Sequence, residues 1–328
     1  MASLIDPRYS VKIISGGMIY TLDSAMLDCS ISQPKNQLAQ KCQVDLVNVK
    51  VNNTYLSDIL KVNCAAIVYY DSGSSTKEKM QGKVWSAKTS ESDENILQLL
   101  IYDAGIYLQK SKASWYIGGQ TKSVFKKICK KWGVPLVYNY ASIKHTKQAI
   151  RSKTLADTFI DFLDEVKKQS GKKYELYFSG GTLHVEYAGN NSTIYHVTEK
   201  INAVKIDTET TMDDVVTHVV IQGPASKKGK PKVVKTLKKN TGIYGRLQDE
   251  ISKDKKTSKK KAIKEAKYIL KEKSTPKTTS TITCIDIPSL KRGDKVYVKS
   301  QTKNGYQIIT DIEHNAQKQE MDIETEDV

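Results

Sequence analysis

The side chains of this 328-residue chain that are best suited to chemistry are five histidines and five cysteines, and both sets are scattered. The cysteines form no CxxC pair, and no histidine stands at metal-ligand spacing from another ligand. Histidines within predicted strands more often have a structural hydrogen bond than a ligand or base role. We therefore predict reduced, buried thiols and no metal site. The residues are His145, His184, His196, His218, His314, Cys29, Cys42, Cys64, Cys129 and Cys284.

Two glycine-containing segments resemble catalytic or nucleotide-binding motifs without fulfilling them. Gly118-Gly-Gln-Thr-Lys-Ser123 lacks the glycine spacing of a phosphate-binding loop. Ser179-Gly180-Gly181 lacks the strand-turn-helix surroundings of a nucleophile elbow, so it is interpreted as a turn. No glycosidase, peptidase or nucleotide-binding motif is present, and the sequence predicts no catalytic residue, no cofactor and no enzymatic activity.

The net charge of +16 is the strongest electrostatic feature, and its distribution is uneven. Residues 225–277 contain 19 Lys or Arg and 5 Asp or Glu, whereas the rest of the chain contains 33 and 31. The basicity is therefore assigned to this one segment. Its lysines are solvated, or they dock on an acidic protein surface. Binding of nucleic acid is less favoured, because only Tyr244 and Tyr268 could stack on bases. The candidate docking residues are Lys255, Lys256, Lys259, Lys260, Lys261 and Lys264.

Three regions must position these residues, and the first, residues 1–117, is predicted to be a β-barrel-like domain. Residues 11–22 indicate a hairpin that turns at Gly16-Gly17. Residues 42–51 alternate apolar and polar side chains, as a strand with one buried face does. Residues 65–70 and 96–102 are further predicted strands. A small antiparallel barrel or sandwich accommodates such strands.

The second region, residues 118–195, is predicted to be a small α+β domain. Apolar residues from Val124 to Trp132 recur at helical spacing, and Gly133 ends that helix. Thr154 and Asp157 resemble a capping box at the start of a second helix, which Gly171 ends. Residues 174–187 indicate another hairpin.

The third region, residues 196–328, is predicted to be a second β-barrel-like domain interrupted by the basic insertion 225–277. Strands are predicted at residues 203–207, 215–222, 280–287, 295–299, 306–313 and 320–325. Within the insertion, Ala262 and Ala266 belong to a short amphipathic helix that ends before Pro276. The predicted fold is therefore mixed and mainly β, with two barrel-like units flanking an α+β unit.

A weak internal repeat links the two β domains. Residues 60–68 align with residues 290–298 at three identical positions of nine, and two predicted strands follow each segment. Both a shared fold and a chance match are compatible with this similarity.

The C-terminal third carries a recognisable succession of motifs. Ile243-Tyr-Gly-Arg-Leu-Gln248, the alanine-containing helix, residues 281–298 and residues 307–314 follow one another. This succession resembles the XkdQ-type tail proteins of PBSX-like prophages, which are similar to the hub proteins of contractile phage tails and R-type bacteriocins. The resemblance covers about residues 214–326. The motif residues are structural, and they are Tyr244, Gly245, Leu290, Gly293 and Asp294. The lysine density of residues 255–261 exceeds what the family implies.

The resemblance implies a mechanical function. Such hubs resemble homotrimers whose subunits each contain two barrel-like units. The trimer then presents six units to a six-fold tube on one side, while a three-fold spike attaches on the other side. The implied partners are the tail tube protein, the spike and other baseplate proteins. Two alternatives are a nucleic-acid-binding module that uses the insertion and a peptidoglycan hydrolase. No secretory signal or transmembrane run is found, so we expect assembly in the bacterial cytoplasm and incorporation into a virion or tail-like particle.

Overall fold

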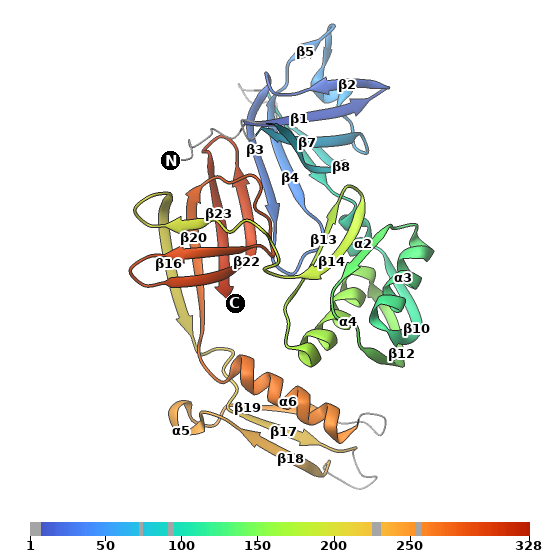
Figure 1. Cartoon of the computed structure of the whole chain (residues 1–328). Coiled ribbons are helices and arrows are strands. Elements are labelled where there is room, and N and C mark those ends of the chain that lie inside the picture. Colours follow the sequence, from blue (N-terminus) through green and yellow to red (C-terminus); the bar gives the residue numbers. More distant parts are fainter. Residues whose placement is uncertain (1–7, 72–74, 91–94, 225–230, 253–257) are drawn as a thin grey trace. The chain divides into compact units, whose positions relative to one another are not determined.

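The computed structural model describes residues 8–71, 75–90, 95–224, 231–252 and 258–328 (Figure 1). Strands hold 52% of the described residues and helices 19%, so the predicted mixed, mainly β fold class is confirmed. The chain forms two compact units. The first comprises residues 1–160, 174–207 and 280–328, and the second comprises residues 161–173 and 208–279. No helix in the described ranges is both long and apolar enough to cross a membrane.

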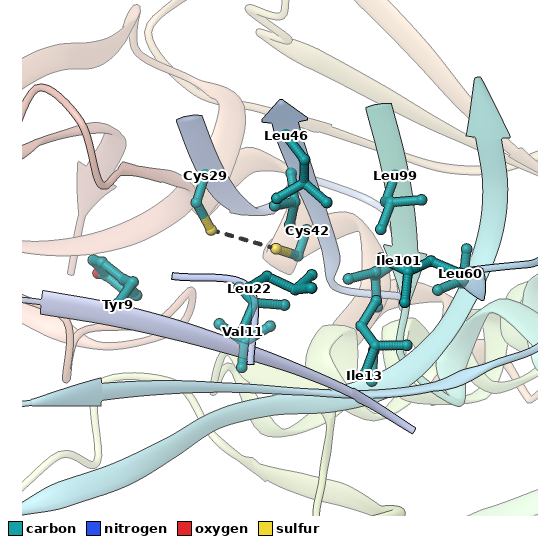
Figure 2. Packing of buried hydrophobic residues seen from close by; sticks show 14 of the residues in the cluster. Tyr9, Val11, Ile13, Leu22, Cys29, Cys42, Leu46, Leu60, Leu99 and Ile101 are labelled. Atoms are coloured by element: carbon teal, nitrogen blue, oxygen red, sulfur yellow. Dashed lines mark hydrogen bonds between the residues drawn. The ribbon is translucent and has the colours of Figure 1, made fainter. Parts of the chain in front are cut away.

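The first β region contains nine strands and one short helix. They are β1 (Arg8–Ser15), β2 (Met18–Thr21), β3 (Met26–Gln33), β4 (Lys41–Val47), β5 (Lys50–Val51), β6 (Thr54–Tyr55), α1 (Leu56–Ile59), β7 (Ala65–Asp71), β8 (Thr76–Ser90) and β9 (Ile96–Tyr102). The predicted β1–β2 hairpin is confirmed, and Gly16 and Gly17 turn it with φ of 57° and 79°. Inward-facing side chains such as Val11, Leu46 and Ile101 form one core, in which the Cys29 and Cys42 Sγ atoms lie 3.7 Å apart (Figure 2).

The middle region is α+β. It contains α2 (Gly105–Lys110), β10 (Lys112–Gln120), α3 (Thr121–Trp132), β11 (Leu136–Asn139), β12 (Lys144–Thr154), α4 (Leu155–Ser170), β13 (Tyr174–Ser179) and β14 (Thr182–Tyr187). Both predicted helices are present. Gly133 caps α3 with φ of 66°, and the Thr154 Oγ1 atom accepts from the Asp157 amide at 3.0 Å at the start of α4. The predicted hairpin is β13–β14, turned by Gly180 and Gly181.

The C-terminal region alternates between the two compact units. Its elements are β15 (His196–Thr198), β16 (Ala203–Thr211), β17 (His218–Gln222), β18 (Val233–Lys238), α5 (Thr241–Tyr244), β19 (Gln248–Ser252), α6 (Lys259–Lys273), β20 (Lys277–Ile285), β21 (Lys295–Lys299), β22 (Asn304–Asn315) and β23 (Glu320–Asp327). Strands β18, β17 and β19 form a three-stranded sheet, and Ala262, Ala266 and Leu270 of α6 pack on it with Val219 and Ile221. This small sheet and helix are the core of the second unit.

The large sheet joins the first β region to the last one. Its order is β16-β20-β23-β22-β3-β4-β9-β8-β7-β1-β2; in addition, β21 pairs with β22, and β15 pairs with β21. The junction is the pairing of β22 with β3, in which Glu313 lies opposite Ser32. Strands from opposite ends of the sequence therefore share one backbone hydrogen-bond network.

The turns before β7 and before β21 share a buried leucine, a positive φ and an amide hydrogen bond to the following hairpin strand. Leu60 and Leu290 are both buried at these turns, with 0% and 1% exposed. Three residues later, Asn63 and Gly293 both have a positive φ, of 71° and 88°. The Asn63 amide donates to the Val84 carbonyl at 2.7 Å, and the Gly293 amide donates to a β22 carbonyl at 2.9 Å. These turns are the two segments that the internal repeat aligns.

The strands that follow the two turns also correspond. Strand β8 has a bulge at Trp85, which is skipped in the pairing with β9, and β22 has a bulge at Thr310, which is skipped in the pairing with β23. The carbonyls that accept from the Asn63 and Gly293 amides belong to Val84 and Ile309. Each bulge is the next residue along the strand. The units β7–β8–β9 and β21–β22–β23 therefore share turn, register and bulge, so the internal repeat extends to backbone structure.

Candidate functional site

A buried polar cluster lies within the first unit, where the two β regions meet. Tyr9 comes from β1 and Lys79 from β8, whereas Asp286 follows β20 and His314 lies on β22. The side chains of His314 and Asp286 are 2% and 0% exposed. The Tyr9 hydroxyl donates to Asp286 Oδ2 at 2.6 Å, across 277 positions of sequence. The cluster therefore joins distant parts of the chain, and its His314 and Asp286 side chains are too buried to reach a substrate.

The hydrogen bonds of this cluster assign one protonation state. The Lys79 ammonium lies 2.6 Å from the Pro288 carbonyl, 2.8 Å from the Leu290 carbonyl and 2.9 Å from His314 Nε2, so all three of its protons have acceptors. His314 Nε2 lies 3.2 Å from the Leu290 carbonyl and closer, at 2.9 Å, to the Lys79 ammonium, and this shorter contact favours an unprotonated Nε2. Its Nδ1 carries the proton and donates to Asp286 Oδ1 at 2.6 Å. The network therefore assigns a neutral His314, whose Nδ1–H faces Asp286 and whose Nε2 faces Lys79.

Burial shifts both basic groups toward their neutral forms. Desolvation lowers the pKa of Lys79 to about 8, although Asp286 and Asp294 oppose this shift. Burial and the charge of Lys79 lower the pKa of His314, whereas its bond to Asp286 acts in the opposite direction. Near neutral pH a proton on His314 is therefore unfavourable beside the Lys79 ammonium.

The lowered pKa of His314 predicts a pH-dependent contribution to stability. The unfolded chain takes up a proton on this histidine below about pH 6.5, while the folded chain does so only at lower pH. The stabilising contribution is therefore present above pH 6.5 and is lost on acidification. We expect the free-energy gap between the wild type and His314→Gln to shrink by up to about 1.4 kcal/mol per pH unit below 6.5. Urea unfolding of both proteins from pH 7.5 to 5 measures it, and a constant gap would contradict the assignment.

Arg292 forms a second junction, in which its guanidinium makes four hydrogen bonds and an ion pair. Its Nε and Nη2 atoms lie 2.8 and 2.7 Å from Glu175 Oε1, and Nη2 also donates to the Leu176 carbonyl at 3.1 Å. Its Nη1 donates to the carbonyls of Pro34 and Gln37. The side chains of Arg292 and Glu175 are 11% and 14% exposed. This arginine thus ties the turn before β21 to the β13–β14 hairpin and to the loop after β3.

The predicted structural motif surrounds this arginine. A glycine is required at position 293 for two reasons. Its φ is 88°, and a Cβ atom there would lie 2.6 Å from Glu175 Cγ. Asp294 Oδ2 accepts from the Lys291 amide at 3.1 Å, and burial raises the pKa of Asp294 to about 6. Leu290 is buried below the turn. The motif therefore holds Arg292 in place, although no local pattern in the sequence distinguishes that residue.

A cavity of about 400 Å³ lies beside the motif, and its carboxylates already have partners. Glu175 is paired with Arg292, and Glu186 accepts from the Tyr177 hydroxyl at 3.1 Å. The Lys291 ammonium lies 3.7 Å from the centre of the Tyr177 ring. Within the described ranges, no group of three or more His, Cys, Asp or Glu side chains could hold a metal ion.

The other two motif residues lie in the second unit. Tyr244 ends the short helix α5, and Gly245 follows it with φ of 75°. The Gly245 carbonyl accepts from Thr217 Oγ1 at 2.7 Å. Both residues therefore shape the connection from α5 to β19.

The structure separates the candidate docking lysines. Lys255 and Lys256 lie outside the described residues, and Lys261 forms an ion pair with Glu165 of α4 at 3.5 Å. Glu265 forms the reciprocal pair with Lys168 at 3.0 Å, so this side of α6 faces α4. The exposed candidates are Lys259, Lys260 and Lys264. Lys260 and Lys264 continue into a ridge of exposed lysines with Lys267 and Lys271, which recur at helical spacing.

The whole-chain fold is that of phage tail proteins. It resembles the 43 kDa tail protein of prophage MuSo2 from Shewanella oneidensis, with a TM-score of 0.70, 13% identity, and coverage of 96% of this chain and 98% of that one. A tail protein from Neisseria meningitidis MC58 also gives a TM-score of 0.70, with 14% identity and coverage of 97% and 96%.

Sequence comparison identifies the family. The model of the YQBQ-like family matches residues 29–326, so the chain belongs to that family. The phage-like element PBSX protein XkdQ of Bacillus subtilis (strain 168) is 25% identical over 246 residues, which cover 72% of this chain and 73% of XkdQ. The resemblance to XkdQ-type tail proteins that the C-terminal motifs predicted is confirmed.

Proposed function

We propose that this chain is a structural hub or baseplate component of a contractile phage-type tail, where it links a hexameric tail tube to a trimeric spike. Membership of the YQBQ-like family, similarity to XkdQ and a fold shared with prophage tail proteins support a tail or baseplate role. The hub position and the contractile type of tail are the specific content of the proposal. An R-type bacteriocin is one particle that would use such a hub.

The duplicated β unit is the observation that carries this proposal. Units β7–β8–β9 and β21–β22–β23 share a turn, a register and a bulge. In the proposed particle each unit is part of a barrel-like domain, and three copies of the chain form a homotrimer. Such a trimer presents six similar units around one axis, which matches a six-fold tube while the chain itself keeps three-fold symmetry.

The two buried junctions fit a role without catalysis. Lys79 and Asp286 hold the two β regions together, and Arg292 adds the middle region. A part that transmits force between a tube and a spike needs broad packed interfaces and a rigid body, not an open reactive site. The proposed role is therefore non-enzymatic and requires no cofactor.

The exposed lysines of α6 are proposed to dock on an acidic surface of a baseplate neighbour. Lys259, Lys260 and Lys264 are free of the ion pair that occupies Lys261. A ridge of like charge steers association with an oppositely charged partner. The proposal places assembly in the bacterial cytoplasm and the finished chain in the tail-like particle.

Copy number tests the hub proposal most directly. Contractile particles are purified after prophage induction, and quantitative mass spectrometry compares this chain with the tube subunit. We expect about three copies per particle, retained through high-salt washing. Absence from intact particles, or about six copies, would overturn the trimeric adapter.

A further inference from the structure

The near balance of charge outside residues 225–277 conceals a second basic segment. Residues 104–156 contain 11 Lys or Arg and no Asp or Glu, whereas the remaining residues outside both segments contain 22 and 31. The assignment of basicity to the insertion alone is therefore wrong. All residues of this second segment belong to the first compact unit.

The acid-free segment forms an antiparallel ribbon of β10 and β12, with α3 packed on β10 (Figure 1). Ile117 of β10 and Ile150 of β12 are buried, with 4% and 9% exposed. Tyr116 points the other way and is 69% exposed. Its direct partner across the ribbon is Ala149, whose methyl group leaves the ring uncovered. One face of the ribbon thus presents a bare aromatic ring to solvent.

Two cations flank this ring. Lys147 and Arg151 lie two residues on either side of Ala149 along β12, and both are exposed. Both cations lie at register shifts of the ribbon, Lys147 next to the pair Ile117–Gln148 and Arg151 next to the pair Trp115–Ile150. Alternation from Ala149 puts them on the face of Tyr116, one on each side of its ring. No carboxylate of the segment competes for them, because residues 104–156 contain none.

We propose that the outer face of the β10–β12 ribbon binds single-stranded nucleic acid, with a base stacked on Tyr116 and phosphates held by Lys147 and Arg151. An exposed ring beside cations is the arrangement that binds single strands without sequence preference. A protein partner is less well matched, because the cores of protein interfaces are depleted in lysine. This proposal does not depend on the hub role, because binding is measured with the purified chain outside any particle.

Fluorescence anisotropy with a labelled 20-residue oligo-dT tests the proposal on the full chain. Tyr116→Ala is expected to weaken binding by roughly 5- to 100-fold, which is the range for loss of one stacked base. Lys147→Gln with Arg151→Gln is expected to lower the slope of log affinity against log salt by about 1.4, because each phosphate contact contributes about 0.7. Thermal unfolding of each variant verifies that it folds.

Two matched controls keep the test specific. Tyr306→Ala removes another tyrosine of the first unit, 53% exposed with the Lys295 ammonium 5.8 Å from its ring, and should leave binding unchanged. Lys260→Gln with Lys264→Gln removes the same charge from α6 and should weaken binding less than the ribbon variant. The proposal is overturned if oligo-dT does not bind at low salt, or if only the α6 variant loses binding. Equal affinity for polyglutamate, with no effect of Tyr116→Ala, would also overturn it.

Discussion

Replacing Arg292 with alanine is expected to destabilise the first unit by about 3–5 kcal/mol, the range for a buried ion pair that loses one partner. The substitution removes all five guanidinium donors and leaves Glu175, whose side chain is 14% exposed, without its cation. It also leaves the carbonyls of Leu176, Pro34 and Gln37 without their guanidinium donor. Urea unfolding followed by circular dichroism measures the loss.

The matched control is Arg151→Ala, which removes an exposed arginine from the same unit and should change stability by no more than about 0.5 kcal/mol. A double-mutant cycle with Glu175→Ala isolates the pair, and we expect a coupling energy of about 1–3 kcal/mol. If Arg292→Ala costs no more than the control, the guanidinium does not hold the three regions together.

The strands with one buried face could be predicted from the sequence. Strands β9 and β21 have the predicted bounds, 96–102 and 295–299, because their side chains alternate between the core and the surface. Strand β4 was predicted to reach residue 51 but ends at Val47. Asn48 interrupts it, since its Oδ1 accepts from the Ser57 amide at 2.9 Å and its Nδ2 donates to Asn95 Oδ1 at 3.2 Å.

Strand β12 could not be predicted from hydrophobic alternation. Only His145 and Ile150 are buried in Lys144–Thr154, and most of its other side chains are exposed on both faces. The charge pattern of this region was available in the sequence, but a total taken over all residues outside 225–277 averaged it against acidic segments elsewhere. Counting charges in successive windows along the sequence reveals the acid-free segment 104–156.

The junction residues illustrate what a single sequence leaves undetermined. Arg292 and Glu175 are 117 positions apart, and Lys79 and His314 are 235 positions apart. A lysine or a histidine in a strand has the same local signature whether it ends in solvent or in a buried network. The turn motif at Leu290-Lys-Arg-Gly-Asp294 gave the position of one junction, because Gly293 and Asp294 have local backbone roles, but it did not reveal the distant partner.

Replacing Asp286 with asparagine is expected to destabilise the first unit by about 1–3 kcal/mol, because it removes one of the two carboxylates that favour the buried Lys79 cation and leaves a buried donor unsatisfied. An amide also offers a single acceptor oxygen, whereas the carboxylate accepts from both the Tyr9 hydroxyl and His314 Nδ1. One buried donor must therefore lose its partner or face the amide NH₂ group. Adding Lys79→Met should recover part of the loss, because it removes the buried cation that Asp286 favours.

Asp58→Asn is the matched control, since its partner Lys61 and Asp58 itself are both 61% exposed, and it should cost less than about 1 kcal/mol. Amide hydrogen exchange shows which strands lose protection when the Asp286 carboxylate is removed. Tyr9 and Lys79 come from one β region and Asp286 and His314 from the other, so protection should fall in β1 and β8 as well as in β22. Loss confined to β20 and β22, or a cost equal to that of the control, would mean that the cluster does not join the two regions. A loss shared by both regions would establish the rigid connection that a force-transmitting tail component requires.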